Sequence, residues 1–537
     1  MVRRTRASGI LLAVLFLVTG CTPTSQPGST TAPASTPKSG GTLVVARPAD
    51  SVSLDSSFAV AANEVWVYNN IYEQLVTIDE NGKIGPGLAE RWERLNDLTM
   101  RFYLRKGVKF QDDTPFDAKA VAFNIDRLVG REPSRFKQYM GFINGAKVVD
   151  DSTVDITSSE PYGPVLGSLS HAIAYMTSPA AVEKWGKDYG RHPVGTGPFT
   201  FVEWKPNDSI TLERNNNYWG AKPYLDKIVF KVIPEEGART IAFDRGDIDV
   251  LLRPAPTELK RFGQDSSVKL FDKLAGTRVI YVGLNVESGP TSDVRVRQAM
   301  AHAVDVRQIN EFVLENAAFP ATNFIAPAIW GYKDEKLNEK YPYSLEKSAS
   351  LMQAAGYTKG QDGMYQKDGK TVEFVYWHTK GNDLKDAEIS QALQAQLVKA
   401  GFKVTLTQHD PTTYLSSLNT GATKYQMFTG GWGVQTGDAD GGLYFTLHSS
   451  AVAPKGSNWA RYANPAVDAL LDKARRSTDD KVRSDAYAQA QDILANDVPW
   501  IPINVIKVLV VTKAYVNGFT PHPNENLLRL GSVWTSK

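Results

Sequence analysis

The chain has 537 residues, with 60 Lys and Arg against 58 Asp and Glu, and a net charge of +2. This balance argues against nucleic-acid binding, which usually needs a strongly basic surface. Cys21 is the only cysteine, so disulfides, cysteine-ligated zinc and thiol catalysis are excluded from the region that follows it. The length exceeds what a single core usually supports, and we expect two or more lobes.

The N-terminal region has the order of a bacterial lipoprotein signal. Three arginines precede a short apolar run at residues 10–18, and Cys21 follows that run. The run is shorter than the roughly 20 residues that a membrane span needs. We predict a signal peptide at residues 1–20, lipidation of Cys21, and a flexible Thr-, Pro- and Ser-rich tether at residues 21–40. The protein is then expected on the extracytoplasmic face of the bacterial membrane, in the periplasm or cell-wall space, anchored only by lipid.

Hydrophobic periodicity predicts strands and helices that alternate along the chain. In chain order, we predict a strand at 42–46, a helix at 63–78, a strand at 101–109, a helix at 117–129, a hairpin at 148–157, a helix at 178–185, strands at 199–204, 210–213, 227–233 and 279–285, helices at 294–304, 305–314 and 344–354, a strand at 372–377, a helix at 383–400, a strand at 404–408, and helices at 465–474 and 480–496. Asp117 and Ser178 are the expected N-caps of two of the helices. The alternation implies an α/β fold with at least partly parallel sheets.

Several short stretches occur in the order found in one known family. They read GGTL at 40–43, IYEQL at 71–75, GLAERW at 87–92, LRKGVKF at 104–110 with DTPF at 113–116, HPVGTGPF at 192–199 with ERN at 213–215 and YW at 218–219, and DVRVRQA at 293–299. Together they resemble the large extracellular solute-binding proteins of ABC importers, family 5.

That resemblance implies a fold and a set of partners. The fold is the two-lobed, type II periplasmic-binding-protein fold of the large peptide-binding class. Its first lobe would comprise residues 41–274 and 504–537, with a subdomain inserted at about 88–189, and its second lobe residues 275–503. A small peptide-like ligand would bind between the lobes, and hinge closure would bury it. The expected partner is a separate two-subunit permease with cytoplasmic ATPases. We expect a monomer without cofactor.

The loop at residues 429–440, TGGWGVQTGDAD, carries most information about the ligand. It follows a strand-like run at residues 425–428. In the family's dipeptide and oligopeptide binders, the matching loop has an Asp that pairs with the peptide α-ammonium, where this chain has Gln435. A neutral amide balances a buried positive charge less well than a carboxylate does. The rest of the loop resembles the glutathione-binding branch and some opine binders. We expect glutathione or another modified small peptide, with plain peptides, opines, oligosaccharides and nickel chelates as alternatives.

The other predicted ligand contacts each have a structural alternative. Trp432 either faces the ligand or is a core residue. Thr436 and Asp438 either bind the ligand or cap the next helix, and Tyr139 either binds the ligand or belongs to a solvated cluster. The same alternative, a solvated charge cluster, applies to Arg135 and Lys137. His378 and Asn382 follow a predicted strand and line the second lobe or lie at the surface.

Catalysis is the competing function. The seven histidines show no metal-ligand spacing, so we expect no metal site, and there is no G-x-S-x-G, H-E-x-x-H or Walker motif. Asp438 and Asp440 are the only pair that suggests a secreted hydrolase, but carboxylates in a Gly-rich loop more often form turns. We therefore expect no enzyme activity. A receptor that presents ligand to a signalling partner is a further alternative.

Overall fold

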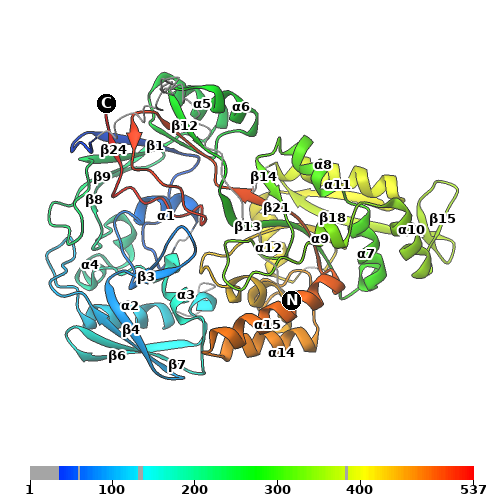
Figure 1. Cartoon of the computed structure of the whole chain (residues 1–537), viewed down its shortest axis with the longest axis horizontal. Helices are drawn as coiled ribbons and strands as arrows, with labels where there is room; N and C mark the ends of the chain where they lie inside the picture. Colours follow the sequence, from blue (N-terminus) through cyan, green and yellow to red (C-terminus); the bar gives the residue numbers. More distant parts are fainter. Residues whose placement is uncertain (1–35, 59–60, 131–136, 381–384, 422) are drawn as a thin grey trace, which may run out of the picture. The chain divides into compact units, whose positions relative to one another are not determined.

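Two large sheets divide the folded chain into two lobes. The computed structural model describes residues 36–58, 61–130, 137–380, 385–421 and 423–537, and Lys38–Lys537 forms one compact unit. We call the part built on the seven-stranded sheet the first lobe and the part built on the six-stranded sheet the second lobe. Figure 1 shows β1, β8 and β9 on one side of the molecule and β18, α7 and α11 on the other.

The first lobe is built around strand β1. Its sheet has the order β12-β22-β11-β1-β10-β9-β8. The strands are β1 Thr42–Arg47, β8 Phe199–Lys205, β9 Ser209–Arg214, β10 Lys227–Val232, β11 Val250–Leu252, β12 Val268–Phe271 and β22 Val510–Lys513. Strand β1 pairs in parallel with β10 and β11, and Leu43 and Val45 are fully buried. This position inside a partly parallel sheet explains why the strand reads as a continuous apolar run. Helices α1 Ala62–Tyr68, α5 Glu236–Arg245 and α6 Leu259–Gln264 and the short strands β2 Val76–Ile78, β3 Ile84–Pro86, β23 Val516–Asn517 and β24 Trp534–Thr535 complete the lobe.

A four-stranded antiparallel sheet, β4-β5-β7-β6, forms a separate layer that we call the insert. Its elements are β4 Ala89–Asn96, β5 Thr99–Leu104, α2 Ala118–Val129, β6 Ile143–Asp150, β7 Thr153–Ser158, α3 Val165–Leu169 and α4 Pro179–Trp185. Asp117 and Ser178 accept backbone N–H groups at the starts of α2 and α4, which confirms both predicted N-caps. The apolar face of α2 packs on the sheet, with Val121 and Ile125 fully buried.

The second lobe has the strand order β14-β21-β13-β20-β18-β19. The strands are β13 Ala275–Leu284, β14 Ala318–Pro320, β18 Glu373–Thr379, β19 Lys403–His409, β20 Met427–Gly433 and β21 Trp500–Lys507. The helices are α7 Val294–His302, α8 Val306–Gln308, α9 Leu337–Lys340, α10 Leu345–Ala354, α11 Asp386–Ala400, α12 Pro411–Asn419, α13 Phe445–Leu447, α14 Pro465–Arg476 and α15 Asp480–Asp497, and a small sheet contains β15 Thr358–Lys359, β16 Tyr365–Lys367 and β17 Lys370–Thr371. Within the described residues, no helix combines the length and apolarity of a membrane span.

Two chain segments connect the lobes. Strand β13 follows β12 of the first lobe, and β21 leads into β22 of the same lobe. The two strands pair antiparallel from Ala275↔Lys507 to Gly283↔Trp500, and both lie in the middle of Figure 1. A paired two-strand connection is a geometry that suits a hinge. The predicted lobe boundaries near residues 274 and 503 remain a prediction.

Two predicted helices differ from the structure. The helix expected at residues 63–78 ends at Tyr68, and Val76–Ile78 is strand β2. The Asn70 side chain donates to the carbonyls of Trp66 and Leu528, so a contact with the C-terminal segment holds the chain where the helix stops. The helix expected at 305–314 is α8 followed by a π-helical turn, Ile309–Val313.

Candidate functional site: the contact between the lobes

The loop at residues 434–440 lies where the second lobe contacts the rest of the protein. It follows β20, which extends to Gly433 and thus beyond the predicted run at 425–428. A Cβ atom at Gly167, in α3 of the insert, would lie 3.1 Å from the Thr436 carbonyl oxygen. A Cβ atom at Gly437 would lie 2.3 Å from Ile78 Cδ1 of the first lobe. We call residues 434–440 the interlobe loop.

Among the described residues of the predicted site, only Gln435 has a buried side-chain atom without a hydrogen-bond partner. The residue is half-buried, and its Oε1 atom is inaccessible and makes no hydrogen bond. Buried polar atoms nearly always have a protein or water partner, so an orphaned acceptor needs an explanation. A hydrogen-bond donor on a bound ligand would supply that explanation.

Asp438 is held within the second lobe. Its Oδ2 accepts from Arg483 Nη2 at 2.6 Å, and its Oδ1 accepts from the Asp440 backbone N–H at 2.9 Å. Both side chains of the ion pair are almost fully buried. The loop backbone is fixed as well, because Trp330 N–H donates to the Gly437 carbonyl and Ala439 N–H donates to the Trp330 carbonyl. The geometry places Asp438 as an anchor of the interlobe loop, and a ligand contact of this residue remains a prediction.

Arg475 at the end of α14 is a buried cation that the sequence reasoning missed. Its guanidinium carbon lies 4.9 Å from the ring of Phe142 and 5.5 Å from that of Tyr162, both in the insert. On the second-lobe side it lies 4.0 Å from the Tyr444 ring. Its Nε and Nη1 atoms are buried without a hydrogen-bond partner. An Arg in the last turn of a helix is ordinary in sequence, so no local signal marks this aromatic surrounding.

Asp440 lies beside Arg475 but is not hydrogen-bonded to it. The Arg475 Nη1–Asp440 Oδ2 distance is 3.6 Å, and Asp440 Oδ1 has no partner. Burial raises the pKa of Asp440 to about 6, although the Arg475 charge opposes that rise. Arg475 and Asp440 therefore form a buried ion pair close to the insert, and both side chains keep atoms without a hydrogen-bond partner.

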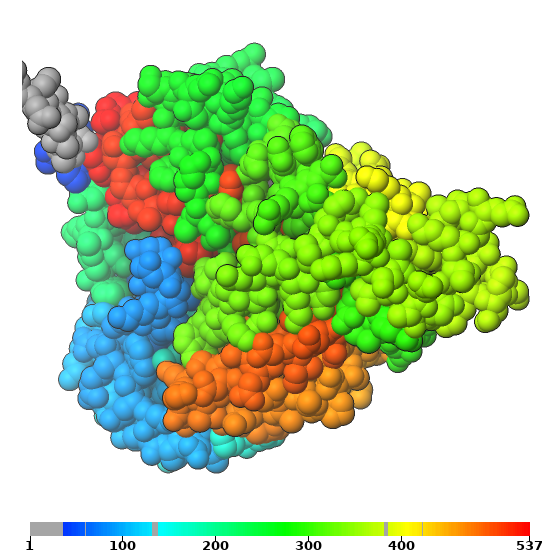
Figure 2. Space-filling model, turned by 45° about the vertical axis from the view of Figure 1, so that its right-hand side comes forward, coloured from blue at the N-terminus to red at the C-terminus, as the bar shows by residue number. Residues whose placement is uncertain are grey.

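Backbone and side-chain contacts join the lobes at this place. The Gly163 N–H donates to the Arg475 carbonyl at 2.9 Å. Arg476 Nε donates to Glu160 Oε2 at 2.8 Å. Figure 2 shows the surface of α14 and α15, in orange, against the surface of the insert, in blue. The structure is therefore that of a form in which the second lobe and the insert touch.

Tyr139 lies at the same contact. It stacks on His171 with ring centroids 4.2 Å apart and meets the edge of Phe445 from the second lobe at 5.6 Å. His171 Nδ1 accepts the Ile173 N–H, and burial lowers the His171 pKa to about 3. The imidazole is thus neutral, with its proton on Nε2, which is buried and has no hydrogen-bond partner.

Trp432 and His378 are placed differently. Trp432 is half-buried in β20, and its Nε1 donates to the Gly441 carbonyl at 2.7 Å. His378 is buried near the end of β18, where Trp377 pairs with Phe428 of β20. Gly433 lies four residues beyond the level of His378, or about 13 Å along the strand. The structure therefore does not bring His378 next to the interlobe loop.

The remaining predicted residues lie wholly or partly outside the described part of the chain. Arg135, Asn382 and Cys21 lie outside the described residues, and only the backbone of Lys137 is described. Among the described positions, no three His, Cys, Asp or Glu side chains are grouped as a metal site would require.

Comparison with known proteins defines the family. Residues 83–454 match the model of bacterial extracellular solute-binding proteins, family 5. The chain is 30% identical over 488 residues to the dipeptide-binding protein of Escherichia coli, covering 86% of this chain and 88% of that one. It is 30% identical over 491 residues to the glutathione-binding protein GsiB of Salmonella paratyphi A, covering 90% and 92%. It is 32% identical to heme-binding protein A of Haemophilus influenzae, covering 81% of each chain.

Solved structures agree with this relationship. The Helicobacter pylori periplasmic binding protein DppA, in complex with the peptide STSA, has a TM-score of 0.77 and 28% identity, covering 93% of this chain and 99% of that one. NikA of Brucella suis, in complex with Fe(III)-EDTA, has a TM-score of 0.82 and 26% identity, covering 92% and 100%. The chain belongs to the family 5 extracellular solute-binding proteins of ABC importers, and its two-lobed fold is the fold of that family.

Proposed function

We propose that this protein is the substrate-binding lipoprotein of an ABC importer and captures a small peptide-like solute between its two lobes. The observation that carries the proposal is the interlobe loop, which contacts the insert through Thr436 and contains the unpartnered Gln435 Oε1. The buried ion pair of Arg475 and Asp440 nearby adds hydrogen-bonding atoms without partners, Arg475 Nε and Nη1 and Asp440 Oδ1. A zwitterionic peptide-like solute supplies complementary groups. The names of the relatives, dipeptide-binding and glutathione-binding, support this class of ligand.

Within that class, glutathione or another modified peptide is favoured over a plain dipeptide or oligopeptide. The N-terminal ammonium of a plain peptide needs a carboxylate of the protein as its partner, because an unpaired buried charge is costly, whereas the ammonium of glutathione lies on the same carbon as an α-carboxylate of its own. At the position where peptide binders are expected to have Asp, this chain has the neutral Gln435. Plain peptides are the second candidate. Opines, oligosaccharides and nickel chelates are further candidates. The structural similarity to NikA in complex with Fe(III)-EDTA supports the nickel chelates.

Delivery completes the proposed mechanism. Closure of the lobes on the solute creates the surface that docks on a separate permease, whose cytoplasmic ATPases supply the energy. Lipidation of Cys21 and the tether at residues 21–40 keep the monomeric protein at the extracytoplasmic face of the membrane. The protein binds its solute without converting it.

The test is a thermal-shift and calorimetric screen of the region from residue 39 onward with glutathione, di- to pentapeptides, opines, oligosaccharides and nickel–histidine. A solute that binds only the folded state raises the unfolding midpoint. We expect a saturable shift with glutathione or another modified peptide and no turnover. A shift with plain peptides alone contradicts the ligand preference, and product formation contradicts binding without conversion.

Gln435→Asp tests the preference at one residue. The new carboxylate is expected to improve the affinity for dialanine relative to glutathione by about tenfold, the typical gain of a charge-assisted hydrogen bond. Gln489→Asp, an exposed change of the same charge on α15, is the control. Unchanged relative affinities in Gln435→Asp count against a role for this position.

A further inference from the structure

A cavity lies inside the second lobe. It has a volume of about 360 Å³, within the range of small-molecule sites. All the residues that line it lie between Ala301 and Pro502. None belongs to the interlobe loop, to the insert or to the first lobe, so the cavity is separate from the contact between the lobes.

The inner wall of this cavity is apolar and rigid. Phe324, Leu337 and Trp500 are almost fully buried, and Trp500 also stacks on Tyr281 of β13 at 3.7 Å. Tyr341 is fixed because its hydroxyl donates to the Ala495 carbonyl at 2.8 Å. A preformed apolar wall of this size accepts one branched or aromatic side chain, whose burial is favourable by about 25 cal/mol per Å².

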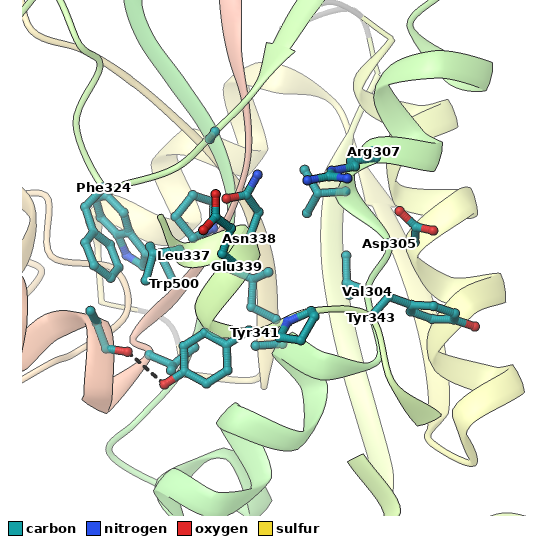
Figure 3. Close-up of a pocket in the computed structure, with 18 residues that line it drawn as sticks. Val304, Asp305, Arg307, Phe324, Leu337, Asn338, Glu339, Tyr341, Tyr343 and Trp500 are labelled. Atoms are coloured by element: carbon teal, nitrogen blue, oxygen red, sulfur yellow. Dashed lines mark hydrogen bonds between the residues drawn. The ribbon is translucent and has the colours of Figure 1, made fainter. Parts of the chain in front are cut away.

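The mouth of the cavity carries charges of both signs. Arg307 and Glu339 are exposed, and neither side chain makes an ion pair or a hydrogen bond within the described part of the chain. Asp305 adds a second carboxylate, of which one oxygen accepts the Gln308 N–H. Figure 3 shows Arg307 and Asn338 pointing toward each other from opposite sides of the cavity, with Phe324 and Trp500 together at one end.

We propose that this cavity binds a free α-amino acid with a large apolar side chain, of leucine to phenylalanine size. The side chain enters the apolar wall. The carboxylate faces Arg307, whose guanidinium can donate two parallel hydrogen bonds, and the ammonium faces Glu339. This site is separate from the contact between the lobes and does not depend on the solute that binds there.

The experiment is isothermal titration of L-phenylalanine and L-leucine into the free protein and, in parallel, into the protein with excess glutathione. We expect saturable 1:1 binding at concentrations up to about 1 mM. Arg307→Gln is expected to weaken binding about tenfold or more, since the residue is exposed and unpaired and its loss leaves the fold intact. Phenethylamine, which lacks the carboxylate, is expected to bind weakly and equally to both proteins.

Arg245→Gln, an exposed arginine at the end of α5, is the matched control and should not change the affinity. Absence of saturable binding overturns the proposal, as does binding that is insensitive to Arg307→Gln. Binding that is lost in Gln435→Asp but kept in Arg307→Gln places the amino acid between the lobes and also overturns it. None of these results bears on whether the interlobe site binds a peptide.

Discussion

The ion pair between Asp438 and Arg483 gives the sharpest stability prediction. Arg483→Met keeps a side chain of similar length but leaves the Asp438 carboxylate buried, with only the Tyr487 hydroxyl at 3.4 Å and a backbone N–H as donors. Breaking one side of a buried pair typically costs about 3–5 kcal/mol. We expect a loss of that order in the free energy of unfolding, measured by urea denaturation without ligand.

Lys481→Met is the matched control. Lys481 and Asp485 form a pair on the same helix with nearly the same distance, 2.7 Å, but both side chains are exposed. Exposed pairs contribute about 0.2–1 kcal/mol, so this variant should lose much less. Adding Asp438→Asn to Arg483→Met removes the unpaired charge and should restore part of the stability. Equal small losses in both single variants, with ligand binding abolished only in Arg483→Met, would refute the anchoring role and point to a direct ligand contact of Asp438.

Two further changes test the contact between the lobes. Glu160→Ala removes an exposed pair with Arg476, so we expect titration to show solute affinity reduced by no more than about fivefold and an unchanged unfolding free energy; a larger affinity loss would contradict this reading. Burial holds the His171 pKa at about 3, below its ordinary value of 6.5. The stability that the neutral imidazole contributes is therefore fully present above pH 6.5 and is lost as the pH falls toward 3. Between pH 7 and pH 5 the wild type should lose about 2 kcal/mol more than His171→Phe in urea unfolding, and parallel pH profiles would show that His171 is not the group responsible.

Much of the fold was predictable from sequence because local patterns agreed with tertiary structure. The apolar run of β1 reflects burial on both faces of the sheet, and the N-caps Asp117 and Ser178 begin α2 and α4 as expected. The helix predicted through residue 78 failed because its end is set by hydrogen bonds from Asn70 to a segment more than 450 residues away in sequence. Periodicity cannot contain that information.

The candidate site was predictable only in part, and the reason is similar. The interlobe loop could be recognised from its sequence and its place after a strand. The aromatic surrounding of Arg475 combines side chains from the insert and the second lobe that have no common spacing. The sequence predicts His378 just after a strand, whereas it lies within β18. The register of β18 against β20 separates it from the interlobe loop, and sequence alone does not give register.

Closure of the two lobes around the solute is the central claim, and Gly163 tests it most directly. A Cβ atom at Gly163 would lie 2.2 Å from the Ser477 carbonyl oxygen across the contact, a distance that the closed form cannot accept. Gly237→Ala, in α5, meets nothing within 4 Å and serves as control. The measurement is calorimetric titration of glutathione and dialanine into the wild type and both variants. We predict 1:1 binding to the wild type and to Gly237→Ala, with affinity at least about tenfold weaker in Gly163→Ala. Equal affinities in all three proteins, or no saturable binding of any peptide-like solute to the wild type, would contradict the account.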